Sequence, residues 1–259
     1  MRQKIIRSFC LARALSKLGY CSRSRAAELI RAGRVTLNGE ICRNPQAAVR
    51  SATHIAVDGS NVKEREKIYI MLNKPRGTIT TASDEKGRET VYALLSQHSG
   101  AAAKPHKDSE PWIAAVGRLD KASEGLLLLT NDSEWGARIA APETHLEKSY
   151  HAQIGTIADE EFIKALLRGV ETGDGTKLRA KQVRRLRAGE KNCWLEIVLD
   201  EGKNRHVRRM MESMGIGVLR LVRVAIGPLQ LGDLAKGEWR VLSADEKLEL
   251  DRAMRSRKL

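Results

Sequence analysis

Short apolar runs, each bounded by turn-forming residues such as Gly125 or Asn131, are the feature that most limits how this chain folds. They lie at 68–72, 126–129, 194–199 and 218–226. Runs of this length between turn residues are typical of buried strands. Helical spacing of apolar residues is found at 159–167 and 204–214. Strands therefore outnumber helices here, and we expect an α+β fold whose larger domain is built on a mixed or antiparallel sheet.

The first sixty residues have a different pattern. Leucines at helical spacing predict a helix over 11–18 that stops at Gly19, and Ser22 or Ser24 can cap a second helix that ends at Gly33. Asn38-Gly39 between two apolar stretches predicts a tight hairpin, and 54–57 predicts a further strand. This part of the chain is therefore expected to form a small α/β module.

A short charged stretch, 63–67, marks the predicted domain boundary. We expect a module over 1–62, a larger domain over 67–245 and a basic C-terminal tail over 246–259. The segment 96–110 is rich in Ala, Ser, Lys, Gly and Pro without periodicity, and it predicts a flexible excursion.

The charge balance indicates a polyanionic partner. The chain has 46 Lys and Arg against 32 Asp and Glu, a formal net charge of +14. Nucleic acid is the expected partner, because basic side chains release counterions when they meet phosphates. Aromatic residues make up only 4% of the chain, which argues against a base-stacking platform.

The apolar runs and the cysteines indicate the cellular compartment in which the protein is expected. No segment has the roughly 18 uninterrupted apolar residues of a bilayer span, and no signal-peptide pattern follows the basic N-terminus. The four cysteines are scattered, without a C-x-x-C pair, so neither a zinc site nor a disulfide framework is expected. A reducing compartment, the cytoplasm, fits best.

Several familiar catalytic motifs are absent from the sequence. It contains no phosphate loop, no G-x-S-x-G elbow, no H-E-x-x-H and no complete G-x-G-x-x-G. Nucleotide hydrolysis, zinc hydrolysis and dinucleotide redox chemistry are therefore disfavoured, and we expect no cofactor and no metal. The six histidines show no ligand spacing and are expected on the surface or in loops.

Two segments carry candidate functional residues. Asp120 ends Gly117-Arg118-Leu119-Asp120, just before a predicted buried strand. From spacing alone, an aspartate that only satisfies turn amides is the favoured interpretation. Lys148 and Tyr150 fall on one face of a predicted strand.

The predicted helix at 204–214 has two sides. Val207, Met210, Met211 and Met214 form an apolar stripe, which indicates core packing. Arg205, Arg208 and Arg209 would then project from the other side, as a solvated face or as a binding surface.

Together these segments resemble the RsuA/RluB-type ribosomal RNA pseudouridine synthases. Residues 11–39 are similar to the S4 RNA-binding module, and 71–77 to the strand and turn that open the family's catalytic domain. Residues 117–120 match the catalytic-Asp motif, 148–150 the K-x-Y motif, and 204–210 with 221–228 the C-terminal motif. His206 stands where the family often has Gln.

The resemblance implies an isomerase that acts on uridine already within RNA and uses no cofactor. Asp120 would be the essential carboxylate, and Arg208 its bidentate counter-ion. Tyr150 would pack on the uracil and is the candidate base for the C5 proton. Whether Asp120 attacks C1′ or removes a proton from C2′ stays open.

The same resemblance implies an RNA partner. The target uridine must leave its stack, and Arg118 is placed to occupy the vacated space. The residues expected to hold RNA are Arg23, Arg25, Arg31, Arg34, Arg118, Lys148, Lys203, Arg205 and Arg209. Ribosomal RNA or a pre-ribosomal particle is the expected partner of a monomeric enzyme, with 23S rRNA of the large subunit preferred.

Three alternatives remain at this point. One is the same enzyme acting on 16S rRNA, and another is a non-catalytic S4-type RNA-binding or ribosome-assembly protein. A third is a DNA-binding regulator that places its second helix in the major groove. The hairpin at Asn38-Gly39 and the large second domain fit this last alternative poorly.

Overall fold

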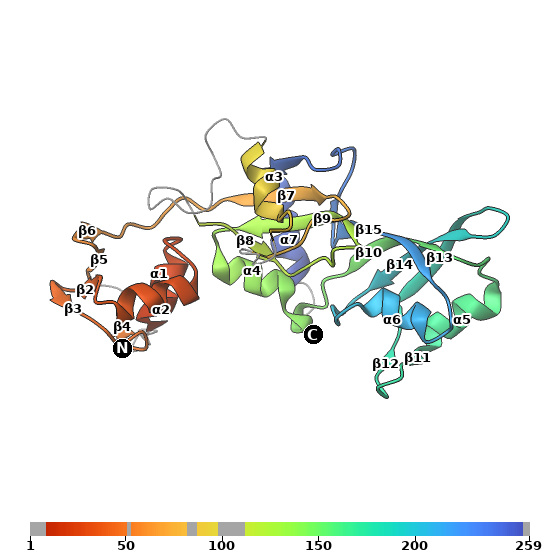
Figure 1. Cartoon of the computed structure of the whole chain (residues 1–259), viewed down its shortest axis with the longest axis horizontal. Helices are drawn as coiled ribbons and strands as arrows, with labels where there is room; N and C mark the ends of the chain where they lie inside the picture. Colours follow the sequence, from red (N-terminus) through yellow and green to blue (C-terminus); the bar gives the residue numbers. More distant parts are fainter. Residues whose placement is uncertain (1–8, 51–52, 82–86, 98–111, 256–259) are drawn as a thin grey trace. The chain divides into compact units, whose positions relative to one another are not determined.

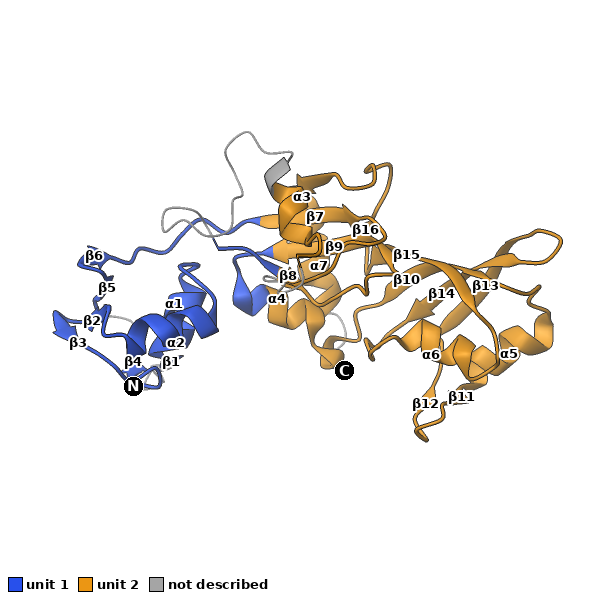
Figure 2. Cartoon of the chain, viewed as in Figure 1, with its two compact units in different colours: residues 1–68, 101–114, 130–135 blue, residues 69–100, 115–129, 136–259 orange. Residues whose placement is uncertain are grey.

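A computed structural model describes residues 9–50, 53–81, 87–97 and 112–255 (Figure 1). The chain divides into two compact units (Figure 2). Unit 1 comprises Met1–Ile68, Ala101–Ala114 and Thr130–Trp135, and unit 2 comprises Tyr69–Gly100, Ala115–Leu129 and Gly136–Leu259. The predicted α+β class is confirmed, with a small N-terminal module and a larger domain that contains a mixed sheet. No helix in the described ranges is long and apolar enough to cross a membrane.

The helices of unit 1 begin and end where the sequence predicted. Helix α1 spans Leu11–Lys17, and α2 spans Arg23–Arg31. Gly19 and Gly33 follow them with φ of +74° each, a conformation that favours glycine after a helix. The backbone N–H of Arg25 donates to Oγ of Ser22 at 3.1 Å, so Ser22 caps the second helix.

Small sheets complete the N-terminal module. Strands β2 (Val35–Leu37), β3 (Glu40–Ile41), β5 (Ile55–Val57) and β6 (Ser60–Asn61) pair in the order β3-β2-β5-β6. Strands β1 (Phe9–Cys10) and β4 (Ala48–Val49) form a separate pair. Asn38 and Gly39 have φ of 52° and 92° and connect β2 to β3, which confirms the predicted hairpin. Leu11, Leu15 and Ile30 pack with Val35 and Val57 in the core of this module.

Unit 2 is built on one sheet, in the order β13-β14-β10-β15-β9-β7-β17. The bounds of these strands are β7 Tyr69–Lys74, β9 Glu124–Thr130, β10 Lys148–Ile154, β13 Gln182–Ala188, β14 Cys193–Leu199, β15 Val218–Ile226 and β17 Trp239–Val241. Strand β8 (Ala114–Val116) adds to β9, and β16 (Leu229–Gln230) adds to β15. The pairing of β15 with β9 is parallel, whereas β10 pairs antiparallel with both β14 and β15. Each of the four predicted apolar runs overlaps one of these strands.

The burial of apolar side chains explains the order of the strands in this sheet. Every residue of β9 is buried, as expected of a central strand covered on both faces. Helices α5 (Glu160–Arg168) and α6 (His206–Glu212) contribute to a cluster with β10 and β14, which includes Ala152, Leu195 and Met210. Strand β13 lies at the sheet edge and is mostly exposed and rich in arginine, which opposes pairing with another chain.

A glycine permits the central parallel pair. Gly125 is the register partner of Arg223 and has φ of +102°. A Cβ atom at this position would lie 2.3 Å from the carbonyl oxygen of Arg223. Only glycine therefore lets β9 and β15 approach as they do.

The remaining elements include two departures from the sequence predictions. Helices α3 (Val91–Gln97), α4 (Ser133–Ala140) and α7 (Ala244–Arg255), the short η1 (Pro142–Thr144) and the pair β11 (Val170–Glu171) and β12 (Lys177–Leu178) complete the described chain. The predicted excursion 96–110 starts inside α3, and 98–110 lies outside the described residues. The predicted tail 246–259 is, up to Arg255, part of α7, because this helix buries Leu250 and Asp251.

Candidate active site

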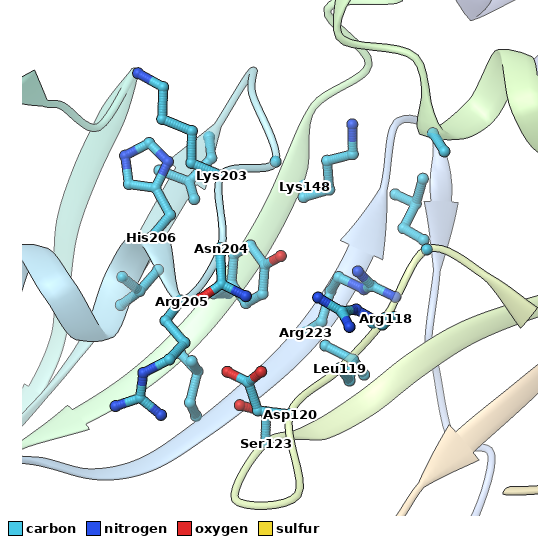
Figure 3. A pocket seen from close by; sticks show the side chains of 18 of the residues that line it. Arg118, Leu119, Asp120, Ser123, Lys148, Lys203, Asn204, Arg205, His206 and Arg223 are labelled. Atoms are coloured by element: carbon cyan, nitrogen blue, oxygen red, sulfur yellow. The ribbon is translucent and has the colours of Figure 1, made fainter. Parts of the chain in front are cut away.

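A cavity of about 310 Å³ lies in unit 2, where the loop before β9, strands β10 and β15, and the start of α6 meet. Figure 3 shows Asp120 and Ser123 at its base, with Lys203, Asn204, Arg205 and His206 on one side and Arg118 and Arg223 on the other. Asp120 is the one carboxylate among its lining residues. The charged and polar residues that line it are Arg118, Asp120, Ser123, Lys148, Tyr150, Lys203, Asn204, Arg205, His206 and Arg223. The cavity therefore favours an anionic ligand.

Buried contacts hold the loop that presents Asp120. The side chain of Lys74 is fully buried, and its Nζ donates to the carbonyl oxygens of Pro75, Asp120 and Ser123 at 3.1, 3.2 and 2.9 Å. The hydroxyl of Thr80 donates to the carbonyl oxygen of Leu119 at 2.9 Å. The backbone at Asp120 is thus fixed from two sides before any ligand enters.

Lys74 also contributes charge. Burial lowers its pKa to about 8, against the attraction of Asp120 and Glu124. A lysine with this pKa is mostly protonated at neutral pH. Asp120 therefore has a buried, positively charged neighbour.

Arg208 is buried, which the sequence did not predict. It is 8% exposed, whereas Arg205 and Arg209 on the same segment are more accessible. Its Nη2 donates to the carbonyl oxygen of Ala122 at 2.9 Å, and its Nη1 to that of Val218 at 3.2 Å. The expected bidentate pair with Asp120 is wrong, because backbone carbonyls take these donors.

Arg208 still acts on Asp120 through its charge. Burial and the nearby Arg205 lower the pKa of Arg208, and Asp120 opposes that shift. Since Ala122 follows Asp120 by two residues, Arg208 bonds to the same loop and adds a positive charge to it.

Strand register brings Tyr150 to the cavity beside a residue that sequence reasoning missed. Tyr150 on β10 is the register partner of Arg223 on β15, and both line the cavity with Lys148. Arg223 is only 6% exposed. A buried arginine inside an apolar strand is unusual, and this was the available signal in the sequence.

His206 also differs from its prediction. It is 4% exposed and lines the cavity, whereas all histidines were expected on the surface or in loops. Its Nδ1 lies 3.9 Å from Oε1 of Glu201. Burial lowers the pKa of His206, although Glu201 attracts the charged form. His98 and His106 lie outside the described residues.

The other residues of the larger domain that were predicted to bind RNA do not all lie at the cavity. Arg118, Lys203 and Arg205 are exposed at the cavity, and Arg205 precedes α6 with φ of +49°, so this helix starts later than predicted. Arg205 also donates to Glu212 at 2.8 Å. Arg209 lies outside the cavity lining, because its guanidinium donates to both carboxylate oxygens of Asp174 at 2.7 Å.

The arginines predicted to bind RNA in the N-terminal module are exposed. Arg23, Arg25 and Arg31 lie on α2, and Arg34 follows it. Arg25 pairs with Glu28 at 3.1 Å, and the guanidinium of Arg34 donates to both oxygens of Asp58. This bond lowers the pKa of the Asp58 carboxyl.

The side chains that line the cavity limit the reactions that it can support. A rigidly held carboxylate among cations can serve as a nucleophile or a base towards an anionic substrate. The aromatic ring at position 150 offers a surface for a planar group, and its hydroxyl a proton donor or acceptor. Among the described residues, no three His, Cys, Asp or Glu side chains are grouped to hold a metal ion.

Comparison with known families gives two matches. Residues 68–213 match the RNA pseudouridylate synthase family, and residues 11–55 match the S4 domain. The first match includes Asp120, Tyr150 and Arg208, and the second includes the four arginines at 23–34.

Individual relatives match almost the whole chain. An uncharacterized RNA pseudouridine synthase of Aquifex aeolicus is 38% identical over 242 residues, which is 93% of this chain and 92% of the relative. The ribosomal large subunit pseudouridine synthase B of Bacillus subtilis is 33% identical over 91% of this chain and 93% of its own length. A crystal structure of a pseudouridylate synthase superposes with a TM-score of 0.62 at 27% identity, covering 94% of this chain and all of that one.

Proposed function

The chain belongs to the RNA pseudouridylate synthase family and carries an S4 domain, and from this we propose that it converts uridine in ribosomal RNA to pseudouridine with Asp120 as the essential carboxylate. The resemblance drawn from the sequence motifs is confirmed at the level of the family. The catalytic interpretation is accordingly favoured over a non-catalytic RNA-binding or assembly protein.

The position of Asp120 is the observation that carries this proposal. Among the described residues it is the one carboxylate that lines a cationic cavity, and buried Lys74 and Arg208 bond to the backbone of its loop. Placing an ionised aspartate near a bound nucleobase costs free energy unless positive charge offsets the desolvation. Lys74 and Arg208 supply that charge while they bond to carbonyl oxygens of the loop.

The reaction is an isomerisation that balances without a co-reactant. The bond between N1 of uracil and C1′ of ribose breaks, the base turns, and C5 bonds to C1′. The proton on C5 then leaves, and N1 of the product carries a proton. Asp120 either attacks C1′ or takes a proton from C2′, and both roles require its ionised form.

Tyr150 is the proposed partner of the base. It lines the same cavity from β10, where its ring can pack on the uracil and its hydroxyl can take the C5 proton. A stacked uridine cannot reach this position, so the nucleotide must first leave its stack at a cost of a few kcal/mol. The exposed Arg118, two residues before Asp120, is proposed to stabilise the vacated position.

Large-subunit rRNA is the proposed substrate. The relatives from Bacillus subtilis and Yersinia pestis, 33% and 34% identical, are named ribosomal large subunit pseudouridine synthase B. The exposed arginines of α2, together with Lys203 and Arg205 at the cavity, are proposed to hold the RNA through its phosphates. We propose that the enzyme works as a monomer in the cytoplasm, on rRNA or a pre-ribosomal particle.

Replacing Asp120 by Asn tests the function. The variant should form no pseudouridine while it still binds rRNA, because the amide is nearly isosteric but can neither attack nor accept a proton. Asp245→Asn, at an exposed position of α7, is the matched control and should keep full activity. Full activity in purified Asp120→Asn would refute the assignment. Mapping pseudouridine in total rRNA with and without the gene would separate 23S from 16S targets.

A further inference from the structure

Arg223 is a buried cation whose hydrogen bonding is incomplete. Its Nε donates to the carbonyl oxygen of Leu126 at 2.7 Å, but its Nη2 is buried and has no hydrogen-bond partner among the described residues. The residue as a whole is 6% exposed, and it lines the cavity that contains Asp120. Leaving a buried charged donor unpaired is costly, so an anionic ligand beside the guanidinium would stabilise Arg223.

Lys148 is a second cation that lines this cavity. It precedes Tyr150 by two residues on β10, and β10 pairs with the strand that carries Arg223. Burial and the charge of Arg223, against the attraction of Asp200, together lower the pKa of Lys148 to about 8. Two cations that repel each other in a partly desolvated site are both stabilised by an anion between them.

We propose that Arg223 and Lys148 form a phosphate-binding subsite that holds a phosphate group of the nucleotide inserted beside Asp120 and Tyr150. This inference rests on the proposed function, since it assumes that a nucleotide enters the cavity. It adds a positioning role for Arg223, which seats the nucleotide so that its sugar faces Asp120.

The chemistry of the two groups favours phosphate. A guanidinium presents parallel donors that fit phosphate oxygens, and an ammonium adds a further charge-assisted bond. Paired strands lie about 4.8 Å apart, so one nucleotide can contact both Tyr150 on β10 and Arg223 on β15.

Binding of pseudouridine 5′-monophosphate and of free pseudouridine to the full chain tests the subsite without any catalytic step. The monophosphate should bind about tenfold or more tightly than the nucleoside, because it makes charge-assisted bonds that the nucleoside lacks. In Arg223→Met and in Lys148→Met this preference should fall towards onefold, while nucleoside affinity changes little. Inorganic phosphate should compete with the monophosphate and not with the nucleoside.

Matched variants separate this role from a loss of folding. Arg184→Met removes an arginine from the same sheet, outside the cavity lining, and should keep the full preference. If Arg223→Met unfolds, Lys148→Met carries the test, because Lys148 is only half-buried. An unchanged preference for the monophosphate in the folded variants would overturn the subsite.

Failure of the subsite and failure of the proposed function give different results. Asp120→Asn should lose activity but keep the preference for the monophosphate. Activity retained in Asp120→Asn would refute the function and leave the binding result standing. A preference that survives in Arg223→Met and Lys148→Met, with Asp120→Asn inactive, would refute only the subsite.

Discussion

Asp120 does not form the expected ion pair with one arginine; several buried cations surround its loop instead. Lys74 and Arg208 bond to the backbone of the loop, and Arg223 lies across the cavity with an unpaired donor. A guanidinium or ammonium that bonds to a carbonyl keeps its full charge while it fixes the chain. Each of these residues thus has a structural and an electrostatic effect.

Arg208→Lys should show both effects. Lysine cannot reach Ala122 and Val218 together, so the free energy of unfolding should fall by about 1–3 kcal/mol. A displaced Asp120 should lower kcat on the order of 100-fold. Urea unfolding and single-turnover assays measure the two quantities. Arg185→Lys, whose Nη1 donates to the carbonyl oxygen of Ala158 outside the cavity, is the control and should keep its activity. An Arg208→Lys enzyme with wild-type kcat would contradict a positioning role.

Lys148 should make nucleotide binding depend on pH. Its pKa of about 8 means that its charge is present below pH 8 and lost as the pH rises through that value. A phosphate monoester is already doubly charged there, since its second pKa is about 6. Affinity for pseudouridine 5′-monophosphate should therefore decrease between pH 7 and about 9.5.

Lys148→Arg distinguishes this titration from that of other groups. The arginine stays charged throughout the range, so the decrease should largely disappear. The charged groups that act on Lys148 are Arg223 on β15 and Asp200 at the end of β14. Lys74 also has a pKa of about 8, but it is fully buried, does not line the cavity and is unchanged in the variant. The same pH dependence in Lys148→Arg would assign it to Lys74 or another group.

At the scale of elements, the parallel pair of β9 with β15 decides where the cavity forms. β9 begins just after Asp120, and β15 carries Arg223 and pairs on its other side with β10, which carries Tyr150. The register that joins Gly125 to Arg223 therefore brings three distant segments together. A glycine in this register is a requirement for the site as well as for the sheet.

Gly125→Ala should disrupt the pair. The added Cβ would meet the backbone of Arg223 at 2.3 Å, at a φ that non-glycine residues rarely adopt. We expect a loss of about 3 kcal/mol or more in the free energy of unfolding, and lower activity. Gly173→Ala is the matched control, since a Cβ there meets nothing within 4 Å, and its stability should change by less than about 0.5 kcal/mol. Equal unfolding midpoints for the two variants would contradict this account of the β9–β15 contact.

At the scale of the whole molecule, positive charge is found in both units. The net charge of +14 includes exposed arginines on α2 in unit 1 and a cationic cavity in unit 2. Exposed cations contribute affinity through phosphate contacts that carry little sequence information. We therefore expect RNA affinity and catalysis to respond to different substitutions.

Arg23→Gln combined with Arg31→Gln tests this division. Both side chains are exposed on α2, so the variant should fold normally and bind rRNA fragments more weakly. The slope of log K against log salt concentration should fall by about one for each phosphate that the variant no longer neutralises. Lys164→Gln, exposed on α5, is the control. An unchanged salt slope in the double variant would argue against RNA binding by α2.

Much of the local structure was predictable from the sequence. Gly19, Ser22 and Asn38-Gly39 specify a helix end, a helix cap and a turn through their own backbone preferences, and the structure has each of them. The apolar runs predicted the strands because periodicity and turn residues are local signals. The same holds for the segments that carry Asp120 and Tyr150, whose motifs indicated the family.

What the sequence alone determined about this protein is its class of fold, its short-range turns and caps, and the segments that carry the candidate chemistry. The tertiary structure decided which polar residues are buried and what they bond to. Arg208 meets Ala122 across 86 residues of sequence, and Arg223 meets Leu126 across 97. Helices and turns follow from interactions within a few residues, whereas the burial and pairing of a charge depend on strand order and register, which bring distant residues into contact.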